Sequence, residues 1–545
     1  MAIETPFSKM CALVVDDAPV QQATLRGQLS MIGVQRIEVA SNPDDALRMA
    51  KSGKYNLVMC DYSLGHKTDG QQLFEYLRDN QILSPDCLFF MVTAENAYAS
   101  VAAASEHKPD AYLLKPITAS DIEDRLKVAI ERRKAFAAVN AAQARNDLPG
   151  ALTACEAIVA RKDRWLMQAL QQRGQILLQL GRHADARTLY QGVLAQRSQL
   201  VWAQIGMARA YKAGGLFEEA KQLAQEIIQS PEGGRNLAAY DVLADSLEAQ
   251  GDTRGAQWAL RDAAMAVPSA KRQRLLADCA FRNGDLDVVT EYLGKVIKAT
   301  QGAMTAVPQD NLSLAQAMVD VGQPAQGMAL LEQMAGKFPN APNVESIAQA
   351  IRAQALARSG DAIGAEKAVA RARETLRGAK ADFATVALAK AEIVTGNEDA
   401  GLRLLGVAVS SDHENPRVRQ LVRKALRDTG HEEKMDTLVE AAAAGLQTRV
   451  SEAKGLFRDS RIDDALGAIE AALKDYPDNT GVLLQAAQMN CLSLRLKKQL
   501  NSAVVERVRL YLARLDKLMP GNDRVTQMQR YFRETLNSLA EPAEA

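Results

Sequence analysis

The chain has 545 residues, with 66 basic and 66 acidic side chains and therefore no formal net charge. A chain of this length exceeds one hydrophobic core, so several domains or an array of repeats are expected. The balanced charge gives no overall electrostatic footprint for nucleic acid or an anionic membrane, and we expect neither a DNA-binding domain nor a membrane partner. No segment approaches 18 consecutive apolar residues, and the first residues lack the pattern of a signal peptide.

Six cysteines lie at positions 11, 60, 87, 155, 279 and 491, without pairs at metal-ligand spacing. Three of them fall in or beside apolar runs that predict buried strands. They are typical of reduced core residues rather than of a disulfide framework. We therefore expect a soluble, cytoplasmic protein.

Four apolar runs in the first 116 residues each end in a polar side chain. The runs over 11–15 and 57–60 end in carboxylates, and those over 89–92 and 111–114 end in a hydroxyl and an ammonium. Short apolar runs between turn signals are typical of buried parallel strands, whose carboxyl ends meet at one edge of the sheet. The side chains expected to meet there are Asp16, Asp17, Asp61, Thr93 and Lys115.

Helical patterns separate these runs over 19–32, 43–51, 71–79 and 96–106, and a further strand is predicted over 37–40. Five strand–helix units predict an α/β doubly wound parallel sheet of the flavodoxin-like kind. Three carboxylates at one sheet edge repel each other unless a cation neutralises them. An all-oxygen donor set suits a hard ion that keeps some of its waters, namely Mg²⁺.

Residues 10–132 resemble a response-regulator receiver domain of bacterial two-component signalling. The resemblance implies that Asp61 accepts a phosphoryl group from a histidine kinase or a phosphotransfer protein. It implies Mg²⁺ as cofactor, bound by Asp17, Asp61 and the main-chain carbonyl of Ser63, with Asp16 acting through water. Thr93 would be the switch hydroxyl and Lys115 the lysine that pairs with the phosphoryl group.

Further positions match or depart from the same family. Tyr112 matches its rotating aromatic residue and Pro116 its proline after a cis bond, while Leu64-Gly65 replaces the usual Met-Pro in a loop one residue longer. The family's dephosphorylation rate is set two residues after the acceptor and two after the switch hydroxyl, here Ser63 and Glu95. The resemblance also leaves a homodimer through this domain open.

A helical pattern begins at Thr118, which can cap a helix together with Asp121, and residues 122–142 contain neither Gly nor Pro. A flexible linker would be rich in Gly, Ser or Pro. We therefore expect a helical junction to the next domain; the alternative is that the helix breaks near Lys134.

After this junction, small residues, a turn glycine and bulky residues recur at intervals of 33–38 residues. The pattern resembles the tetratricopeptide repeat (TPR), whose paired helices pack through small residues into an all-α solenoid. Roughly nine or ten pairs are expected over 137–520, the first turning near 146–149. The expected turn glycines are Gly181, Gly215, Gly251, Gly284, Gly322, Gly360 and Gly396.

We thus predict a receiver domain over 1–133, TPR-like repeats over 134–520, and a capping helix with a disordered tail over 521–545. Trp165, Trp202 and Trp258 could form a ligand cage, but at repeat positions they are typical of an inter-helix core. The basic residues 417–424 could bind RNA, although such clusters are usually the solvated face of a helix.

The favoured hypothesis is a phosphorylation-controlled signalling regulator whose TPR groove binds an unidentified protein or peptide. The alternative is an RNA- or nucleic-acid-directed regulator that uses the helical array. Beyond the self-catalysed phosphotransfer and dephosphorylation of a receiver, no residue pattern indicates an enzyme.

Overall fold

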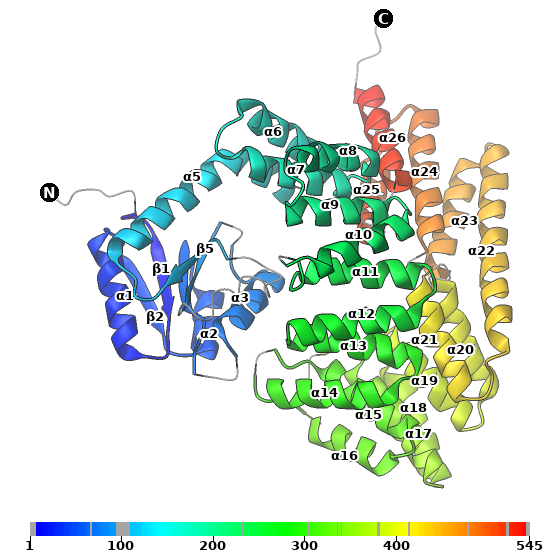
Figure 1. The fold of residues 1–545 in the computed structure, drawn as a ribbon. Coiled ribbons are helices and arrows are strands. Elements are labelled where there is room, and N and C mark those ends of the chain that lie inside the picture. The colour runs from blue at the N-terminus through cyan, green and yellow to red at the C-terminus, as the bar shows by residue number, and fades with distance from the viewer. Residues whose placement is uncertain are drawn as a thin grey trace, which may run out of the picture.

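The computed structural model describes a parallel α/β domain followed by an all-helical array (Figure 1). The described residues are 7–65, 68–84, 86–93, 109–145, 147–231, 233–303, 305–334, 336–338, 341–378, 382–411, 415–476, 479–518 and 523–540. Within these ranges, no helix is both long enough and apolar enough to cross a bilayer.

The α/β domain contains a five-stranded parallel sheet in the order β2-β1-β3-β4-β5. This order and the all-parallel pairing confirm the doubly wound sheet that the sequence predicts. The strands are β1 (Cys11–Val15), β2 (Arg36–Ala40), β3 (Leu57–Asp61), β4 (Leu88–Thr93) and β5 (Ala111–Leu114).

Helices cover both faces of this sheet. Leu25 and Leu29 of α1 (Pro19–Met31) are buried against one face, together with the first half of α5 (Ala119–Ala144). The other face is covered by α2 (Pro43–Ser52) and α3 (Gly70–Asp79). The helix that the sequence predicts over 96–106 lies outside the described residues.

Helix α5 belongs to both parts of the chain. Its start is a capping box in which Thr118 and Asp121 each accept from the other's backbone N–H. Ile122 and Leu126 lie in the core of the sheet, whereas Phe136 and Val139 lie in the first core of the helical array. The expected junction is therefore confirmed as one continuous helix.

The array continues with antiparallel helices in chain order (Figure 1). They are α6 (Leu148–Arg161), α7 (Leu166–Gln179), α8 (His183–Gln196), α9 (Val201–Ala213), α10 (Phe217–Gln229), α11 (Leu237–Ala249), α12 (Thr253–Ala266), α13 (Ala270–Asn283), α14 (Leu286–Thr300), α15 (Pro308–Asp320), α16 (Pro324–Met334), α17 (Val344–Arg358), α18 (Ala362–Thr375), α19 (Phe383–Val394), α20 (Glu398–Ser411), α21 (Pro416–Asp428), α22 (Lys434–Arg458), α23 (Ile462–Asp475), α24 (Thr480–Lys497), α25 (Ser502–Leu518) and α26 (Asp523–Ala540).

Glycine makes two kinds of contribution to this packing. All seven predicted turn glycines have φ between +69° and +93°, a conformation that glycine adopts without a steric penalty. Within helices, Gly174 of α7 and Gly206 of α9 lie against the ring of Tyr190, because an added Cβ at either glycine would approach a ring or hydroxyl atom within 2.3 Å. Small residues therefore let three successive helices close around one aromatic side chain.

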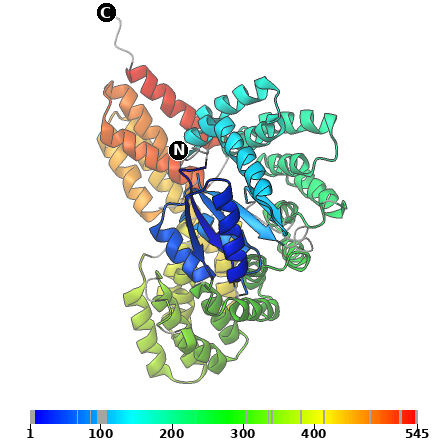
Figure 2. The same cartoon turned by 90° about the vertical axis from the view of Figure 1, so that its left-hand side faces the viewer.

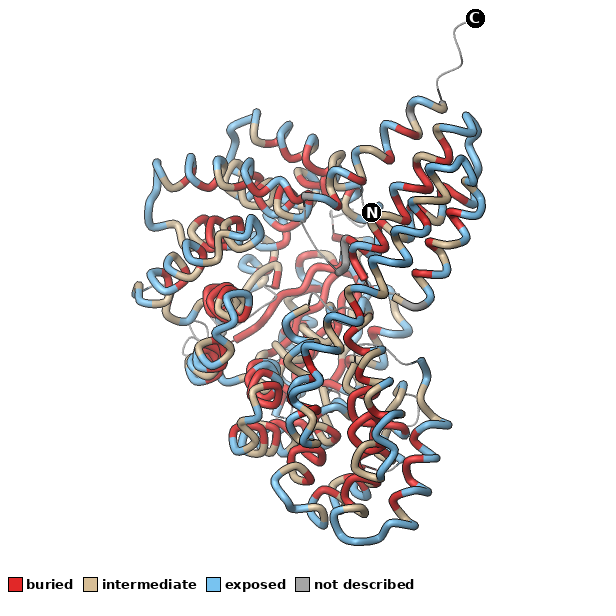
Figure 3. Tube along the Cα trace, turned by 90° about the vertical axis from the view of Figure 1, so that its right-hand side faces the viewer, coloured by how far each residue is buried: buried red, intermediate tan, exposed pale blue. Residues whose placement is uncertain are grey.

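The array curves into a ring, and the α/β domain lies in front of the ring's opening (Figures 1 and 2). In both views the C-terminal helices α25 and α26 lie beside α7 and α8. The hydroxyl of Thr526 in α26 donates to the carbonyl of Leu180 at the end of α7. Buried residues recur along the facing sides of neighbouring helices, and exposed residues lie on their outer turns (Figure 3).

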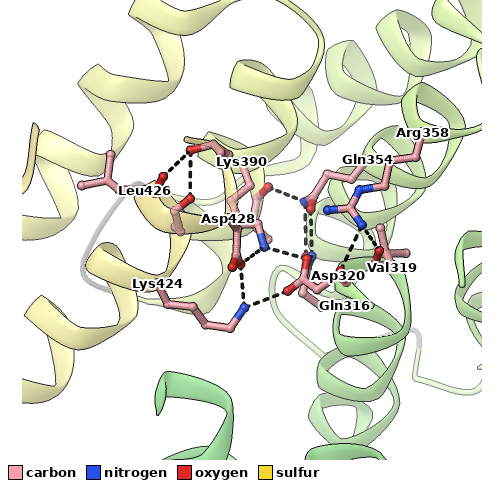
Figure 4. Close-up of polar contacts among 12 residues, drawn as sticks. Gln316, Val319, Asp320, Gln354, Arg358, Lys390, Lys424, Leu426 and Asp428 are labelled. Atoms are coloured by element: carbon pink, nitrogen blue, oxygen red, sulfur yellow. Dashed lines mark hydrogen bonds and ion pairs between the residues drawn. The ribbon is translucent and has the colours of Figure 1, made fainter. Parts of the chain in front are cut away.

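Helix α21 joins two segments that are distant in the sequence. It contacts both α13 and α19, and Arg417 at its start pairs with Glu248 of α11 at 2.7 Å. A group of four charged residues, which we call the buried ion cluster, joins it to α15 and α19 (Figure 4). Its members are Asp320, Lys390, Lys424 and Asp428.

In the buried ion cluster each lysine bridges both carboxylates. Lys390 Nζ lies 2.8 Å from Asp320 and 2.6 Å from Asp428, and Lys424 Nζ lies 2.8 Å and 2.6 Å from the same two residues. Gln316 also donates to Asp320, over 2.9 Å (Figure 4). The cluster balances two positive and two negative charges inside the protein.

The three tryptophans do not share one environment. Trp165 meets Phe136 and Trp202 meets Tyr190 edge to face, with ring centroids 6.5 and 6.3 Å apart. Both therefore lie in the inter-helix core, as expected. Trp258 is 69% exposed, so the core interpretation is wrong for this residue.

Candidate functional site

Four strands place their polar side chains at the same edge of the sheet. Asp16 and Asp17 follow β1, Asp61 ends β3 and Thr93 ends β4. The register pairs Asp61 with Val92, one residue before Thr93, so the two ends are level. Lys115 follows β5, and its N–H donates to the carbonyl of Thr93 at 2.9 Å.

The three carboxylates converge as the strand ends predict. Asp16, Asp17 and Asp61 can each offer one oxygen such that these atoms lie within 4.8 Å of one another. Asp16 is buried and Asp61 is 8% exposed, whereas Asp17 is exposed. The site therefore opens to solvent on the side of Asp17.

Lys115 is the cation that the structure places beside these carboxylates. Its Nζ lies 2.9 Å from Asp61 Oδ2 and 3.4 Å from Asp16 Oδ2. Among the residues that the structure describes here, one ammonium faces three carboxylates, which leaves an excess of negative charge. Asp16 is held in place because its Oδ1 accepts from the N–H of Ala18 at 2.9 Å.

Burial and neighbouring charges shift the pKa of both members of the Lys115–Asp61 pair. Burial raises the pKa of the Asp61 carboxyl above its usual value, a rise that hydrogen bonds from Lys115 and from the N–H of Ser63 only partly offset. For Lys115, burial alone would lower the pKa, but the hydrogen bond and the charges of Asp61 and Asp16 outweigh it and raise the pKa. Lys115 is therefore a stable ammonium, whereas burial disfavours the ionised form of the Asp61 carboxyl beside it.

The donor set fits a hard divalent cation. All three converging side chains offer carboxylate oxygens, and their charge exceeds that of Lys115, so a divalent ion would neutralise the remainder. The backbone of Ser63 lies beside this set, because its N–H bonds to Asp61. The acidic triad is of the kind that binds Mg²⁺ in receiver domains.

Two glycines keep the walls of the site close to the carboxylates. Gly65 has φ of +62°, and a Cβ there would lie 2.3 Å from Asp17 Oδ2. A Cβ at Gly70 would lie 2.1 Å from the main-chain oxygen of Asp61. The departure Leu64-Gly65 therefore has a structural reason, since Leu64 is buried in the core and Gly65 lies against Asp17.

The residues expected to act in switching lie around the same edge. Thr93 is buried, and Tyr112 is half-buried against the core on the α2–α3 face. The Lys115–Pro116 peptide bond is cis. Ser63 is exposed next to Asp61, and Glu95 lies outside the described residues.

Two residues that were not among the predicted site residues also shape this site, Gln22 and Gly65. Gln22 of α1 donates to the main-chain carbonyl of Asp16 at 2.6 Å and thus holds the acidic loop against the helix. It looked like an ordinary polar residue on a helix surface, and its position six residues after Asp16 gave no signal. Gly65 was noted only as a departure, although a glycine in a polar loop does indicate a positive φ.

Comparisons with known proteins agree with this geometry. Residues 12–127 match the family described as "Response regulator receiver domain", and residues 177–239 match the family described as "Tetratricopeptide repeat". The chain therefore joins a receiver domain to a TPR helical region. Over 123 residues it is 26% identical to the chemotaxis protein CheY-3 of Vibrio cholerae serotype O1, covering 23% of this chain and 93% of that protein.

Two solved structures show a weak similarity to this chain. A tetratricopeptide repeat protein from Parabacteroides merdae is 13% identical, with 50% of this chain and 96% of that chain covered and a TM-score of 0.30. A structure of Naa15/Naa10 bound to HypK-THB is 14% identical, with 69% and 68% covered and a TM-score of 0.31. Both TM-scores lie below 0.5, so neither similarity extends to the fold of the whole chain.

Proposed function

We propose that this protein is a two-component signalling regulator in which Asp61 accepts a phosphoryl group from a histidine kinase or a phosphotransfer protein. The observation that carries the proposal is the approach of Lys115 to Asp61, at 2.9 Å, beside the converging carboxylates of Asp16 and Asp17. This arrangement sits at the carboxyl edge of a parallel sheet, where such folds hold their ligands.

In the proposed reaction an Asp61 oxygen attacks the phosphorus of a phosphohistidine. A P–O bond forms, the P–N bond breaks, and the imidazole leaves with the bonding electron pair. The ammonium of Lys115 is placed to pair with an oxygen of the transferred group. Bound Mg²⁺, held by Asp17, Asp61 and the Ser63 carbonyl with Asp16 acting through water, would supply positive charge that shields the incoming phosphoryl group.

The acyl phosphate would be read out by Thr93 and Tyr112. Thr93 is buried at the end of β4, beside Asp61 in the sheet, so its hydroxyl is placed to donate to a phosphoryl oxygen. Tyr112 is half-buried and would follow it inward. Pro116 fixes the path of the chain after Lys115. Ser63 and Glu95 would tune dephosphorylation, because their positions in the sequence match those that set this rate in receiver domains.

The helical array would supply the output by binding a protein or peptide partner. We place the boundary between the two parts after Arg133, within α5, because the buried contacts of that helix change there from the sheet core to the first helical core. A cytoplasmic location is supported by six free cysteines, five of them buried. A homodimer through the receiver remains part of the proposal.

The test is phosphorylation of the full chain by a small acyl-phosphate donor with Mg²⁺, followed by intact-mass spectrometry. We expect the wild type to gain one phosphoryl group, and Asp61→Asn or removal of Mg²⁺ to abolish the gain. Asp44→Asn, an exposed carboxylate on α2, is the matched control and should be labelled like the wild type. Strong labelling of Asp61→Asn would refute the assignment.

A further inference from the structure

A cavity of about 490 Å³ lies between α21 and the opposite wall made by the ends of α11, α12 and α13. Its size is in the range of sites for small molecules. It is separate from the receiver site, because every residue that lines it comes from the helical array. Its lining is dominated by arginine.

Three arginines of α21 form one side of this cavity. Arg419, Arg423 and Arg427 are spaced four residues apart, so they lie along one face of the helix at intervals of about 6 Å. Arg254 reaches the cavity from the first turn of α12 on the opposite wall. With Arg282 from the end of α13, five guanidinium groups from two walls thus line the same space.

The cavity has little negative charge to balance them. Glu248 is the one carboxylate among the described residues that line it, and both its oxygens are already engaged, Oε1 by Arg282 and Oε2 by Arg417 at 2.7 Å. Arg427 pairs with Glu432 at 3.1 Å. Arg254, Arg419 and Arg423 have no ion pair with any residue that the structure describes.

Unpaired arginines that share a cavity repel one another and are stabilised by an anion between them. The planar fork of a guanidinium matches a phosphate group in a bidentate way, and two arginines 6 Å apart along a helix can each bind one end of a short polyphosphate. No aromatic ring is among the described lining residues, so the anion itself is the group the cavity is suited to recognise.

We propose that this cavity, which we call the arginine pocket, binds a small molecule bearing two or more phosphate groups. The ligand bridges α21 and α12 and thereby holds together two parts of the ring that are distant in the sequence. This site is additional to the phosphoryl-acceptor site and does not depend on it.

The test is calorimetric titration of the full chain with inorganic tripolyphosphate in Mg²⁺-free buffer. We expect the wild type to bind, and Arg419→Gln/Arg423→Gln to lose at least tenfold in affinity. Both arginines are exposed and unpaired in the described structure, so the variant should keep its fold, which a thermal melt checks. Arg235→Gln/Arg403→Gln removes the same charge from exposed positions outside the pocket and should bind like the wild type.

Equal binding by Arg419→Gln/Arg423→Gln would overturn the proposal, because the anion would then bind elsewhere. Two further ligands, citrate and a single-stranded RNA, test whether the pocket prefers phosphate groups on a small molecule. Citrate that binds as tightly as tripolyphosphate would overturn the preference for phosphate, and weaker binding would support it. A single-stranded RNA that binds through the same arginines while tripolyphosphate does not would overturn the proposal in favour of a nucleic-acid surface.

Discussion

The receiver site and the buried ion cluster are both built from carboxylates and lysines, yet they differ in charge balance. The receiver site places one lysine among three carboxylates at an edge open to solvent. The buried ion cluster places two lysines between two carboxylates, and Lys390, Lys424 and Asp320 are 5%, 2% and 3% exposed. Among the described residues, the first has an unbalanced charge that a bound cation could neutralise, whereas the second is already neutral.

The pKa values of the two buried carboxyl groups shift in opposite directions, upward for Asp61 and downward for Asp320. Burial raises the pKa of Asp61, so the folded protein favours the protonated carboxyl over the ionised one. The stability that this preference contributes is lost as pH rises through the raised pKa. Burial would also raise the pKa of Asp320, but Lys390 and Lys424 outweigh it and lower the pKa to about 2. The two clusters are built from the same residue types, and their charge balance is what differs.

The largest expected effect is at the centre of the buried ion cluster. Asp320→Asn leaves two buried lysines with one carboxylate, and breaking a buried ion pair costs about 3–5 kcal/mol. We expect the free energy of local unfolding of α19 and α21, measured by hydrogen exchange, to fall by this order. Asp436→Asn, an exposed carboxylate on α22, is the matched control and should change it little.

A second variant distinguishes the effect of an unbalanced charge from the effect of lost hydrogen bonds in the buried ion cluster. Replacing the whole cluster with apolar residues of similar size, as Asp320→Leu/Lys390→Met/Lys424→Met/Asp428→Leu, removes every uncompensated charge. Such replacements are often neutral or stabilising. The variant should therefore recover most of the protection lost in Asp320→Asn; protection as low as in the single variant would mean that the cluster's hydrogen bonds, not its charge balance, hold α21.

Acid should destabilise α21 around the buried ion cluster within a defined range of pH. The folded pKa of Asp320 is depressed to about 2 from the ordinary 3.8, so its stabilisation is present above pH 3.8 and is lost as pH falls toward 2. The loss should be on the order of 2 kcal/mol. Exchange protection of α21 in wild type should fall across this window and that of Asp320→Asn should not; parallel acid profiles would contradict the assignment.

At the receiver site, replacing the carboxylate with an amide should stabilise the protein rather than destabilise it. Asp61→Asn removes a buried, disfavoured charge while Lys115 keeps Asp16 as a partner at 3.4 Å. Without Mg²⁺ we expect the melting temperature of the receiver transition to rise by a few degrees, and added Mg²⁺ to stabilise the wild type more than the variant. Asp44→Asn should melt like the wild type. A lower melting temperature for Asp61→Asn would contradict the charge argument.

The smallest expected effect tests whether the two parts act together. Inserting Gly-Gly-Ser-Gly after Arg133 interrupts α5 between its two cores. Labelling of Asp61 and exchange protection of the buried ion cluster should not change, because each site lies wholly on one side. Any change in exchange at α6–α8 caused by beryllofluoride in the wild type should disappear. If it persists at full size, the coupling runs through another contact.

The sequence predicted what local patterns determine. Strand ends placed Asp16, Asp61 and Lys115 at one edge because the sheet is parallel, and turn glycines marked the repeats because each turn requires a positive φ within a few residues. The continuous α5 followed from a stretch without Gly or Pro. Each of these features depends on residues that are neighbours in the chain.

The features that escaped prediction join distant segments. The basic stretch of α21 was interpreted as a solvated helix face, but Lys424 is buried and pairs with Asp320, which lies 104 residues earlier. Lys390 pairs with the same carboxylate over 70 residues. No periodicity connects these positions, because the curvature of the whole ring sets which helices meet.

The hydrogen bond from Thr526 to Leu180 links residues 346 positions apart and brings the last helix of the array against one of its first. In an open solenoid each repeat contacts only its neighbours, so a single repeat can be gained or lost at little expense to the others. In this array the last helix also contacts the end of α7, so the two ends of the array must stay at a fixed distance from each other. We therefore expect that deleting or duplicating one repeat here would break the contact between α26 and the end of α7.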